Sequence, residues 1–133
     1  MSDKQIYAMN IGKIGDSMKE VATLFGDTSR NKVNSSEDLK NMINEYKSSL
    51  KKLQNTRDTF RNLNAPVGFE SDHNKMLSAF ESYVKATEDM VDAVDVDYKG
   101  FNSDAYIAAE ARQQQAAQSI VVSTTETAKR MFP

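Results

Sequence analysis

The chain of 133 residues has the length of a single domain and is long enough to enclose a hydrophobic core. Its 17 basic and 19 acidic residues give a formal charge of −2, which argues against a protein built mainly to coat nucleic acid or anionic lipid. The lack of cysteine excludes a disulfide framework, a thiolate nucleophile and cysteine-based metal sites. Only 5 glycines and 2 prolines occur, so the composition permits long helices.

The first predicted helix covers residues 3–25. Its apolar residues alternate in spacings of four and three, which places them on one helical face. This face comprises Tyr7, Ile11, Ile14, Met18, Val21 and Phe25. Gly26 is expected to end the helix. Gly12 and Gly15 lie inside it at a cost of up to about 1 kcal/mol each relative to alanine, so we expect close backbone approach or local fraying there.

A polar loop is predicted over residues 27–34, and a second helix over residues 36–63. Ser35, with Asp38 three residues later, is typical of a helix N-cap. The apolar face of this helix comprises Leu39, Ile43, Tyr46, Leu50, Leu53, Phe60 and Leu63.

A turn follows, because Pro66 disfavours helical backbone before it and Gly68 permits a positive φ. The third predicted helix covers residues 71–98, with its cap at or near Ser71. Two adjacent apolar rows follow this helix, so we expect it to contact two neighbours. The first row comprises Met76, Phe80, Tyr83, Thr87, Met90 and Val94, and the second comprises Leu77, Val84, Val91 and Tyr98.

A reversal at residues 99–102 precedes the fourth predicted helix, residues 103–131, capped by Ser103 or Asn102. Its expected inner face is rich in small residues and is interrupted by three glutamines at residues 113–115. That face comprises Tyr106, Ile107, Ala109, Ala117, Ile120, Val121, Thr124, Ala128 and Met131.

Four long helices with short connections predict an all-α fold, an antiparallel up-down-up-down four-helix bundle in a single domain over residues 1–133. Charge favours pairing of the second and third helices. Residues 37–61 carry six basic side chains against four acidic ones, whereas residues 70–97 carry eight acidic side chains against two basic ones.

The single histidine, His73, follows Glu70 in an E-x-x-H pattern that puts a carboxylate and an imidazole on one helical face. Di-iron bundles need a second such motif, and the chain has no second histidine. We therefore expect no metal site, and we expect His73 to pack at the start of the third helix with one ring nitrogen hydrogen-bonded or in water.

The segment from Asp95 to Gly100 imitates the start of a calcium loop, but Lys99 and Tyr106 stand where the fifth and twelfth positions need oxygen ligands. A helix end capped by Gly100 is the better interpretation.

Three further patterns favour structural explanations. The acidic cluster of Asp92, Asp95 and Asp97 would attract a cation or a basic partner, but a solvated helix face explains it more simply. The G-x-x-G of Gly12 and Gly15 lies within an apolar heptad, which does not fit a nucleic-acid-binding loop. No nucleophile–base pair or phosphate-binding loop stands out, so we predict no catalytic, cofactor-binding or metal-binding residue and no enzyme activity.

The segment from Leu63 to Tyr83 includes the second turn, residues 64–68. It resembles small helical-bundle lipoproteins of Gram-positive bacteria, of an uncharacterised Bacillus type. In those proteins a helix ends in a short Leu-x-x-Pro turn, and the next helix begins near a histidine that is followed by paired apolar residues and an aromatic residue. The matching positions are Leu63, Pro66, Phe69, His73, Met76, Leu77, Phe80 and Tyr83. The helical layout is also similar along most of the chain.

This resemblance implies an extracellular, cell-surface domain tethered by a lipidated cysteine upstream of the helices. Residues 1–6 lack the apolar core of a signal peptide, and no stretch approaches the roughly 18 apolar residues of a membrane span. The resemblance therefore requires residues 1–133 to be the mature part of a longer precursor. A cytoplasmic location is the alternative.

Three functions remain open from the sequence. The first is a non-enzymatic module on a Gram-positive cell surface that contacts a protein or envelope partner. The second is an intracellular or phage-encoded structural adaptor that self-associates through the alanine-rich fourth helix. The third is a carrier of a small apolar ligand in the bundle core. None of them calls for a cofactor or nucleic acid, and membrane contact would come only through an anchor upstream.

The second turn is the one candidate interaction surface, because Val67 and Phe69 stand there beside Glu70 and Asp72. A hydrophobic staple that seals the base of the bundle explains the same residues and is the favoured interpretation.

Overall fold

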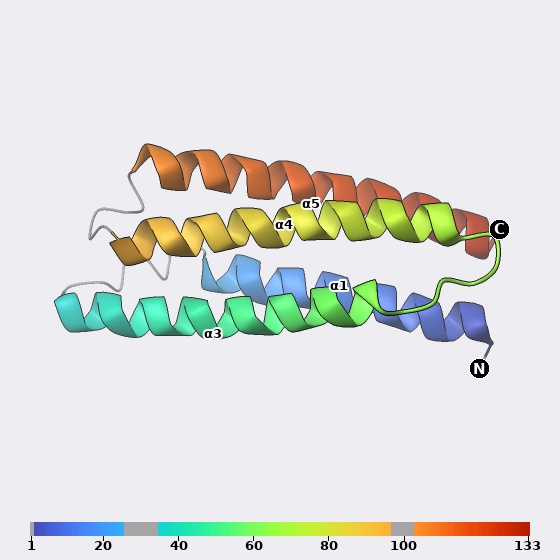
Figure 1. The fold of residues 1–133 in the computed structure, drawn as a ribbon, viewed down its shortest axis with the longest axis horizontal. Helices are drawn as coiled ribbons and strands as arrows, with labels where there is room; N and C mark the ends of the chain where they lie inside the picture. The colour runs from blue at the N-terminus through green and yellow to red at the C-terminus, as the bar shows by residue number, and fades with distance from the viewer. Residues whose placement is uncertain (1, 26–34, 97–102) are drawn as a thin grey trace.

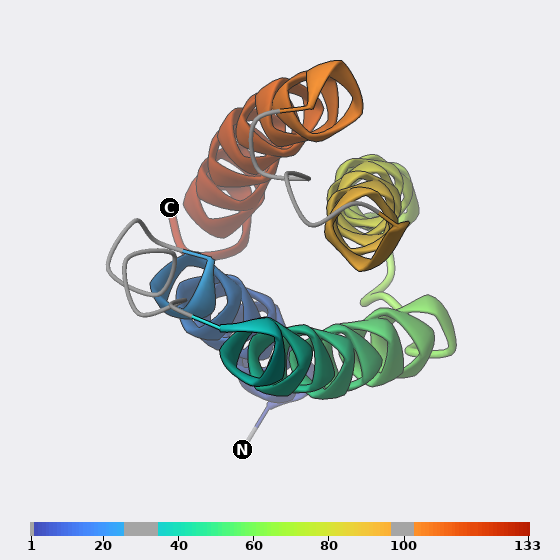
Figure 2. The ribbon, with the colours of Figure 1, turned by 90° about the vertical axis from the view of Figure 1, so that its left-hand side faces the viewer.

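A computed structural model of the chain describes residues 2–25, 35–96 and 103–133, apart from the side chains of residues 95 and 96. These residues form four helices, α1 (Asp3–Leu24), α3 (Ser36–Arg61), α4 (Glu70–Val96) and α5 (Asp104–Met131). Successive helices run in opposite directions (Figure 1) and surround a common axis (Figure 2). The predicted all-α, up-down-up-down four-helix bundle is confirmed.

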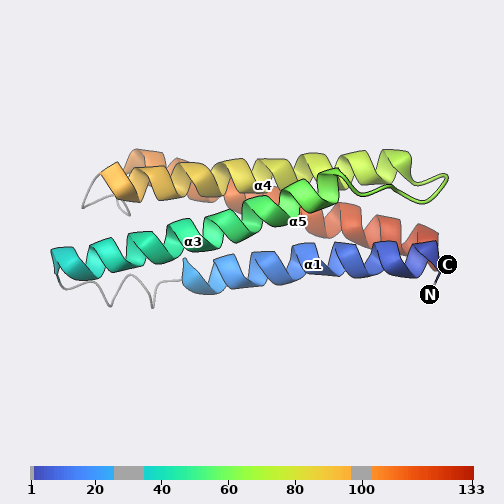
Figure 3. The same cartoon turned by 60° about the horizontal axis from the view of Figure 1, so that its bottom comes forward.

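Helices that follow one another in the chain are also neighbours in space. The contact between α4 and α5 is the most extensive, and α1 meets α5 only briefly. Figure 3 shows α3 running obliquely, from the side of α1 at its start toward α4 at its end. The predicted two-sided contact of α4 is confirmed, since it packs against both α3 and α5.

Hydroxyl side chains cap three of the helices. Ser2 and Gln5 form a reciprocal capping box at the start of α1. The Ser35 hydroxyl accepts a hydrogen bond from the backbone N–H of Asp38 at 3.1 Å, and Ser103 caps α5 in the same manner. The predicted caps at Ser35 and Ser103 are confirmed.

Two helix ends differ from the prediction. The cap at Ser71 is wrong, because α4 begins at Glu70 and the carbonyl of Phe69 already accepts the N–H of His73 at 2.9 Å. Helix α3 ends at Arg61 rather than at Leu63. Between them, Gly68 has φ +90, as the turn requires, and its N–H donates to the Glu70 carboxylate at 3.0 Å.

The predicted inner faces of α1, α3 and α4 form the core. Their members with a buried side chain are Tyr7, Ile14, Val21, Phe25, Leu39, Ile43, Tyr46, Leu53, Phe60, Met76, Phe80, Tyr83, Val84, Thr87, Met90, Val91 and Val94. The others within the described side chains, including Met18 and Leu50, are half-buried against this core. The heptad spacing therefore identified the inner faces of these three helices correctly.

The predicted inner face of α5 is partly wrong. Ile107 and Val121 are 55% and 60% exposed, Ala128 is exposed and Thr124 is only half-buried. The observed inner row has its own heptad spacing and contains polar members. It comprises Tyr106, Ala109, Gln113, Ala116, Ile120, Thr127 and Met131. The prediction considered apolar residues alone and therefore chose wrong positions. The polar side chains that point inward are buried because they have hydrogen-bond partners.

One ion pair joins the two helices of opposite predicted charge. The Arg61 guanidinium lies 2.7 Å from the Glu81 carboxylate, and both side chains are partly exposed. Gln54 also donates to Glu88 at 3.0 Å across the same pair of helices. Contacts of this exposed kind contribute well under about 1 kcal/mol each, so they bias pairing of α3 and α4 more than they stabilise it.

The expectation for Gly12 and Gly15 is wrong in both of its forms. Helix α1 runs unbroken through both positions, and a Cβ built on either glycine would meet nothing within 4 Å. No neighbouring backbone of the described residues therefore requires them to be glycine. The predicted loop over residues 27–34, the stop at Gly26 and the reversal at residues 99–102 lie outside the described residues.

We predict that Gly12→Ala and Gly15→Ala each stabilise the protein by about 0.5–1 kcal/mol, because alanine restricts the unfolded chain and fits the helix without a clash. Urea unfolding measures the change. Gly68→Ala serves as the control, and it should destabilise the protein because φ +90 strains any residue with a Cβ. A loss of stability in both helix variants would contradict the prediction.

Candidate functional site

A polar cluster lies inside the end of the bundle where both chain termini and the turn between α3 and α4 meet (Figure 1). The Tyr7 hydroxyl on α1 lies 2.5 Å from Nδ1 of His73 on α4. Both side chains are buried, and the Phe60 ring stacks on the imidazole with 4.5 Å between ring centroids. Three helices thus meet around one hydrogen-bonded imidazole.

A second polar contact adjoins this pair. Asp72, next to His73, forms an ion pair with Arg130 near the end of α5 and lies within 3.5 Å of the Thr127 hydroxyl. Arg130 also lies over the Phe69 ring, 4.9 Å from its centroid. The turn residue Phe69 and the last turn of α5 are therefore held together by charge and by ring contact.

Burial sets the protonation states of this cluster. It lowers the pKa of the His73 imidazole below its ordinary value, because a charged ring is poorly solvated there. Burial also raises the pKa of Tyr7, and the negative charge of Asp72 adds to that rise. At neutral pH the hydroxyl and the imidazole are both uncharged. With the hydroxyl donating to Nδ1, the ring carries its proton on Nε2.

The E-x-x-H pair does not converge on a metal site. The Glu70 carboxylate accepts the N–H of Gly68, while His73 bonds to Tyr7, so the two side chains serve different partners. Over the described parts of the chain, no three acidic or histidine side chains are grouped as metal ligands. The expected packing of His73 at the start of the third helix, with one nitrogen hydrogen-bonded, is confirmed.

We predict that the free energy of unfolding falls as the pH drops from about 6.5 toward 5. The unfolded imidazole takes up a proton in this range, whereas the folded ring resists protonation because its pKa is lowered. The contribution is complete above about pH 6.5 and is lost below it. Chemical unfolding at a series of pH values measures the slope.

His73→Asn is the control for this slope, which should flatten because the chain has no other histidine. The single imidazole also gives one NMR signal whose chemical shift follows its protonation. This shift should change only at pH values below the ordinary pKa of histidine. An imidazole that titrates at or above its ordinary value would contradict the buried, neutral state.

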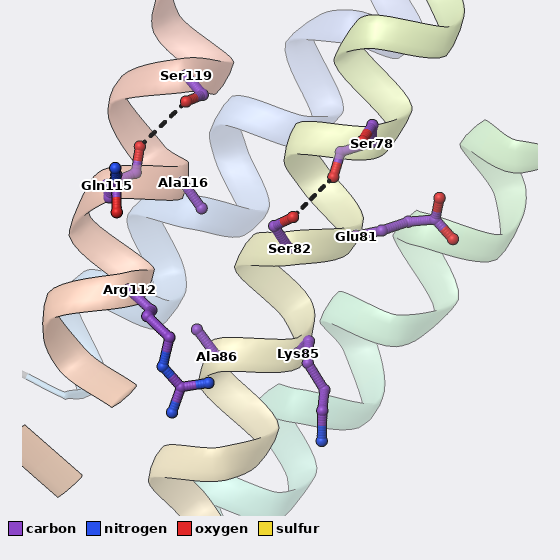
Figure 4. Close-up of a pocket in the computed structure, with 9 residues that line it drawn as sticks. All are labelled: Ser78, Glu81, Ser82, Lys85, Ala86, Arg112, Gln115, Ala116 and Ser119. Carbon is purple, nitrogen blue, oxygen red and sulfur yellow. Dashed lines mark hydrogen bonds between the residues drawn. The ribbon is translucent and has the colours of Figure 1, made fainter. Parts of the chain in front are cut away.

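A groove follows the outer side of the contact between α4 and α5. Three hollows of about 600, 700 and 500 Å³ share lining residues there, so they form one continuous depression. Figure 4 shows Ser82 and Ser119 facing this depression from opposite helices. Each hydroxyl donates to a carbonyl of its own helix, to Ser78 at 3.1 Å and to Gln115 at 3.3 Å. The floor of the groove is therefore formed by small side chains.

Charged side chains flank this groove at two levels. Arg112 and Asp89 form an ion pair of 3.0 Å across the helices at one level, and Lys85 joins the same carboxylate at 2.9 Å. At the other level, Lys75 on α4 and Glu126 on α5 line the same hollow without forming an ion pair to each other.

The two candidate interaction residues of the second turn differ in exposure. Val67 is 94% exposed at the tip of the turn, whereas Phe69 is 7% exposed under Lys4 and Arg130. The predicted sealing role is confirmed for Phe69 and wrong for Val67.

The remaining sequence patterns give no assembled site. Helix α4 continues to Val96, and the imitation calcium loop and its proposed cap at Gly100 extend beyond the described residues. Of the acidic cluster, only the side chain of Asp92 is described, and it is exposed. The G-x-x-G lies within helix α1, as the heptad predicted.

Comparisons with protein-family models, with curated proteins and with solved structures find no match to this chain. Among the described helices, none combines the length and apolarity needed to cross a lipid bilayer.

Sequence reasoning missed most of the polar cluster. It placed His73 in a protected position but not its partner Tyr7, because the two residues are 66 positions apart. It also missed Asp72 with Arg130. The one available signal was an acidic residue at the start of one helix and a basic residue at the end of its antiparallel neighbour.

Proposed function

We propose that the chain is a non-enzymatic helical-bundle module that acts by binding a helix of a partner protein along α5. The supporting observation is a row of uncharged side chains on the outside of α5 that includes two bulky apolar residues. Ile107 and Val121 are 55% and 60% exposed, although the inner face of the same helix is packed in the core.

The outer row of α5 also has heptad spacing. Between Ile107 and Val121, the exposed positions spaced by four and three are occupied by uncharged residues, and the row then reaches Thr125. The row comprises Ile107, Ala111, Gln114, Gln118, Val121 and Thr125. Two heptad rows on one helix are typical of a helix that packs against partners on both sides. An exposed row without charges that includes Ile107 and Val121 favours a protein contact over a solvated surface.

The chemistry of the interior supports binding rather than catalysis. His73 and Asp72 are bonded to residues of other helices, and the buried Thr87 hydroxyl accepts from Gln113 at 2.8 Å and donates to the carbonyl of Tyr83. These groups hold the helices together, because each one is hydrogen-bonded within the bundle. The small Ala109 and Ala116 are buried on the inner face of α5, which favours close packing in the core over a ligand cavity.

We predict that a photoreactive residue at Val121 captures a discrete protein in the native host, whereas the same residue at Lys51 does not. Both positions are exposed on a helix, but Lys51 lies on α3 outside the apolar row. Mass spectrometry of the adduct identifies the partner. The purified partner should bind the chain, and Val121→Lys should weaken binding about tenfold or more, because a charge must be desolvated in the contact. Equal capture at both positions, or none, would overturn the proposal.

We propose a location for this module on the outside of a Gram-positive cell, as the soluble part of a lipoprotein. The resemblance around the second turn supports this location. An intracellular or phage-encoded adaptor would use the same outer row of α5 and is the competing proposal.

We predict that the native protein, isolated from the membrane fraction of its host, has an intact mass that includes a lipid-modified N-terminal cysteine. Such a mass follows from an anchor upstream of the helices. An unmodified product confined to the cytosol would discard the lipoprotein proposal and favour the adaptor.

A further inference from the structure

We propose that the groove between α4 and α5 is the interface of a symmetric antiparallel dimer, in which a second copy of this chain lies face to face with the first. This inference goes beyond the proposed function, because the groove lies beside the outer row of α5 and is not lined by Ile107 or Val121. It is carried by the arrangement of charges and side-chain sizes about the middle of the groove.

The ion pair between Asp89 and Arg112 fixes how the two helices are aligned. Because α4 and α5 run in opposite directions, residues seven before Asp89 and seven after Arg112 lie at the same level. These residues are Ser82 and Ser119, and both line the same hollow. They mark the middle of the groove (Figure 4).

Charges of opposite sign stand at equal distances from this middle. On α5, Arg112 precedes Ser119 by seven residues and Glu126 follows it by seven. A two-fold axis that crosses the groove at Ser119 therefore brings Arg112 of each copy opposite Glu126 of the other. The symmetric interface gains two opposite-charge pairs from this helix.

Helix α4 repeats the pattern. Lys75 and Asp89 lie seven residues before and after Ser82, and the same axis brings each Lys75 opposite Asp89 of the other copy. At each end of the dimer, Lys75 and Glu126 of one copy therefore lie opposite Asp89 and Arg112 of the other. Such complementarity favours this register over slipped ones.

The sizes of the opposed side chains are also complementary under this symmetry. Val122, which is 56% exposed, lies three residues after Ser119, and Ala116 lies three residues before it. The axis places each Val122 opposite the small Ala116 of the other copy, so a projecting side chain meets a shallow one. The serines at the axis allow the helices to approach closely, because they present little more than a hydroxyl.

Sedimentation equilibrium of the purified full chain tests the dimer. Its mass should rise from 14.9 kDa to twice that value as the concentration increases from micromolar to millimolar. Ser119→Arg should weaken the dimer about tenfold or more, because it puts a like-charged pair of bulky side chains on the axis. Ser48→Arg is the matched control, an exposed serine on α3 that lines a different hollow, and it should leave the dimer intact.

Single cysteines test the register, since the chain has none of its own. Ser119→Cys should form a disulfide-linked dimer under mild oxidation, and Ser82→Cys should do the same, because each residue faces its own copy across the axis. Ser48→Cys should remain monomeric. Disulfides that form only between the Ser82 and Ser119 variants when mixed would overturn the antiparallel register.

The outcomes separate this inference from the proposed function. A purified chain that stays at 14.9 kDa at every concentration, or a dimer that Ser119→Arg does not weaken, overturns the dimer. If the photoreactive Val121 variant then captures a different protein, the binding module stands and the self-association is wrong. If it captures nothing, the binding module is wrong, and the dimer is judged by sedimentation alone, because Val121 does not line the groove.

Discussion

The bundle depends on α4 burying two faces at once. Phe80 and Val84 are completely buried on this helix, which packs against α3 on one side and forms the most extensive contact of the fold, with α5, on the other. Helix α1 reaches the rest of the fold mainly through α3. The core is therefore a chain of three contacts rather than a ring of four, and a cavity in α4 would weaken two of those contacts together.

Polar contacts at two levels then fix the alignment of helices that apolar packing alone would leave free to slide. The Asp72–Arg130 pair holds one end of α4 against α5, and the hydrogen bond from Gln113 to Thr87 acts near the middle. The hydrogen bond between Tyr7 and His73 aligns α1 with α4, two helices that are distant in the chain. A buried polar pair of this kind selects one register, because every slipped register leaves an unsatisfied group.

Periodicity predicted the architecture because three helices follow the simple rule that apolar residues point inward. Their inner faces, their caps at Ser35 and Ser103 and the turn at Gly68 all depend on local sequence, which one chain displays in full. The expectation for the glycines of α1 was wrong because a glycine in a helix indicates a loss of helix stability but not the reason for it. The polar cluster escaped prediction because its partners lie far apart in sequence, and pairing over that distance leaves no spacing signal.

The error in α5 has a physical cause that bears on function. A helix with two heptad rows offers two ways to be buried, and a row of isoleucine and valine looks like the inner one. The structure instead buries the row that contains Gln113 and Thr127, because both find hydrogen-bond partners, Gln113 on α4 and Thr127 on both α4 and α5. Burying Val121 and Ile107 instead would leave Thr87 and Asp72 without these donors, at a cost of about 1–3 kcal/mol for each unsatisfied buried group. The bundle thus resolves the competition in favour of hydrogen bonding and leaves the apolar row outside. A helix in that state retains an unused capacity to pack, and its exposed row is the surface on which a partner helix can bind.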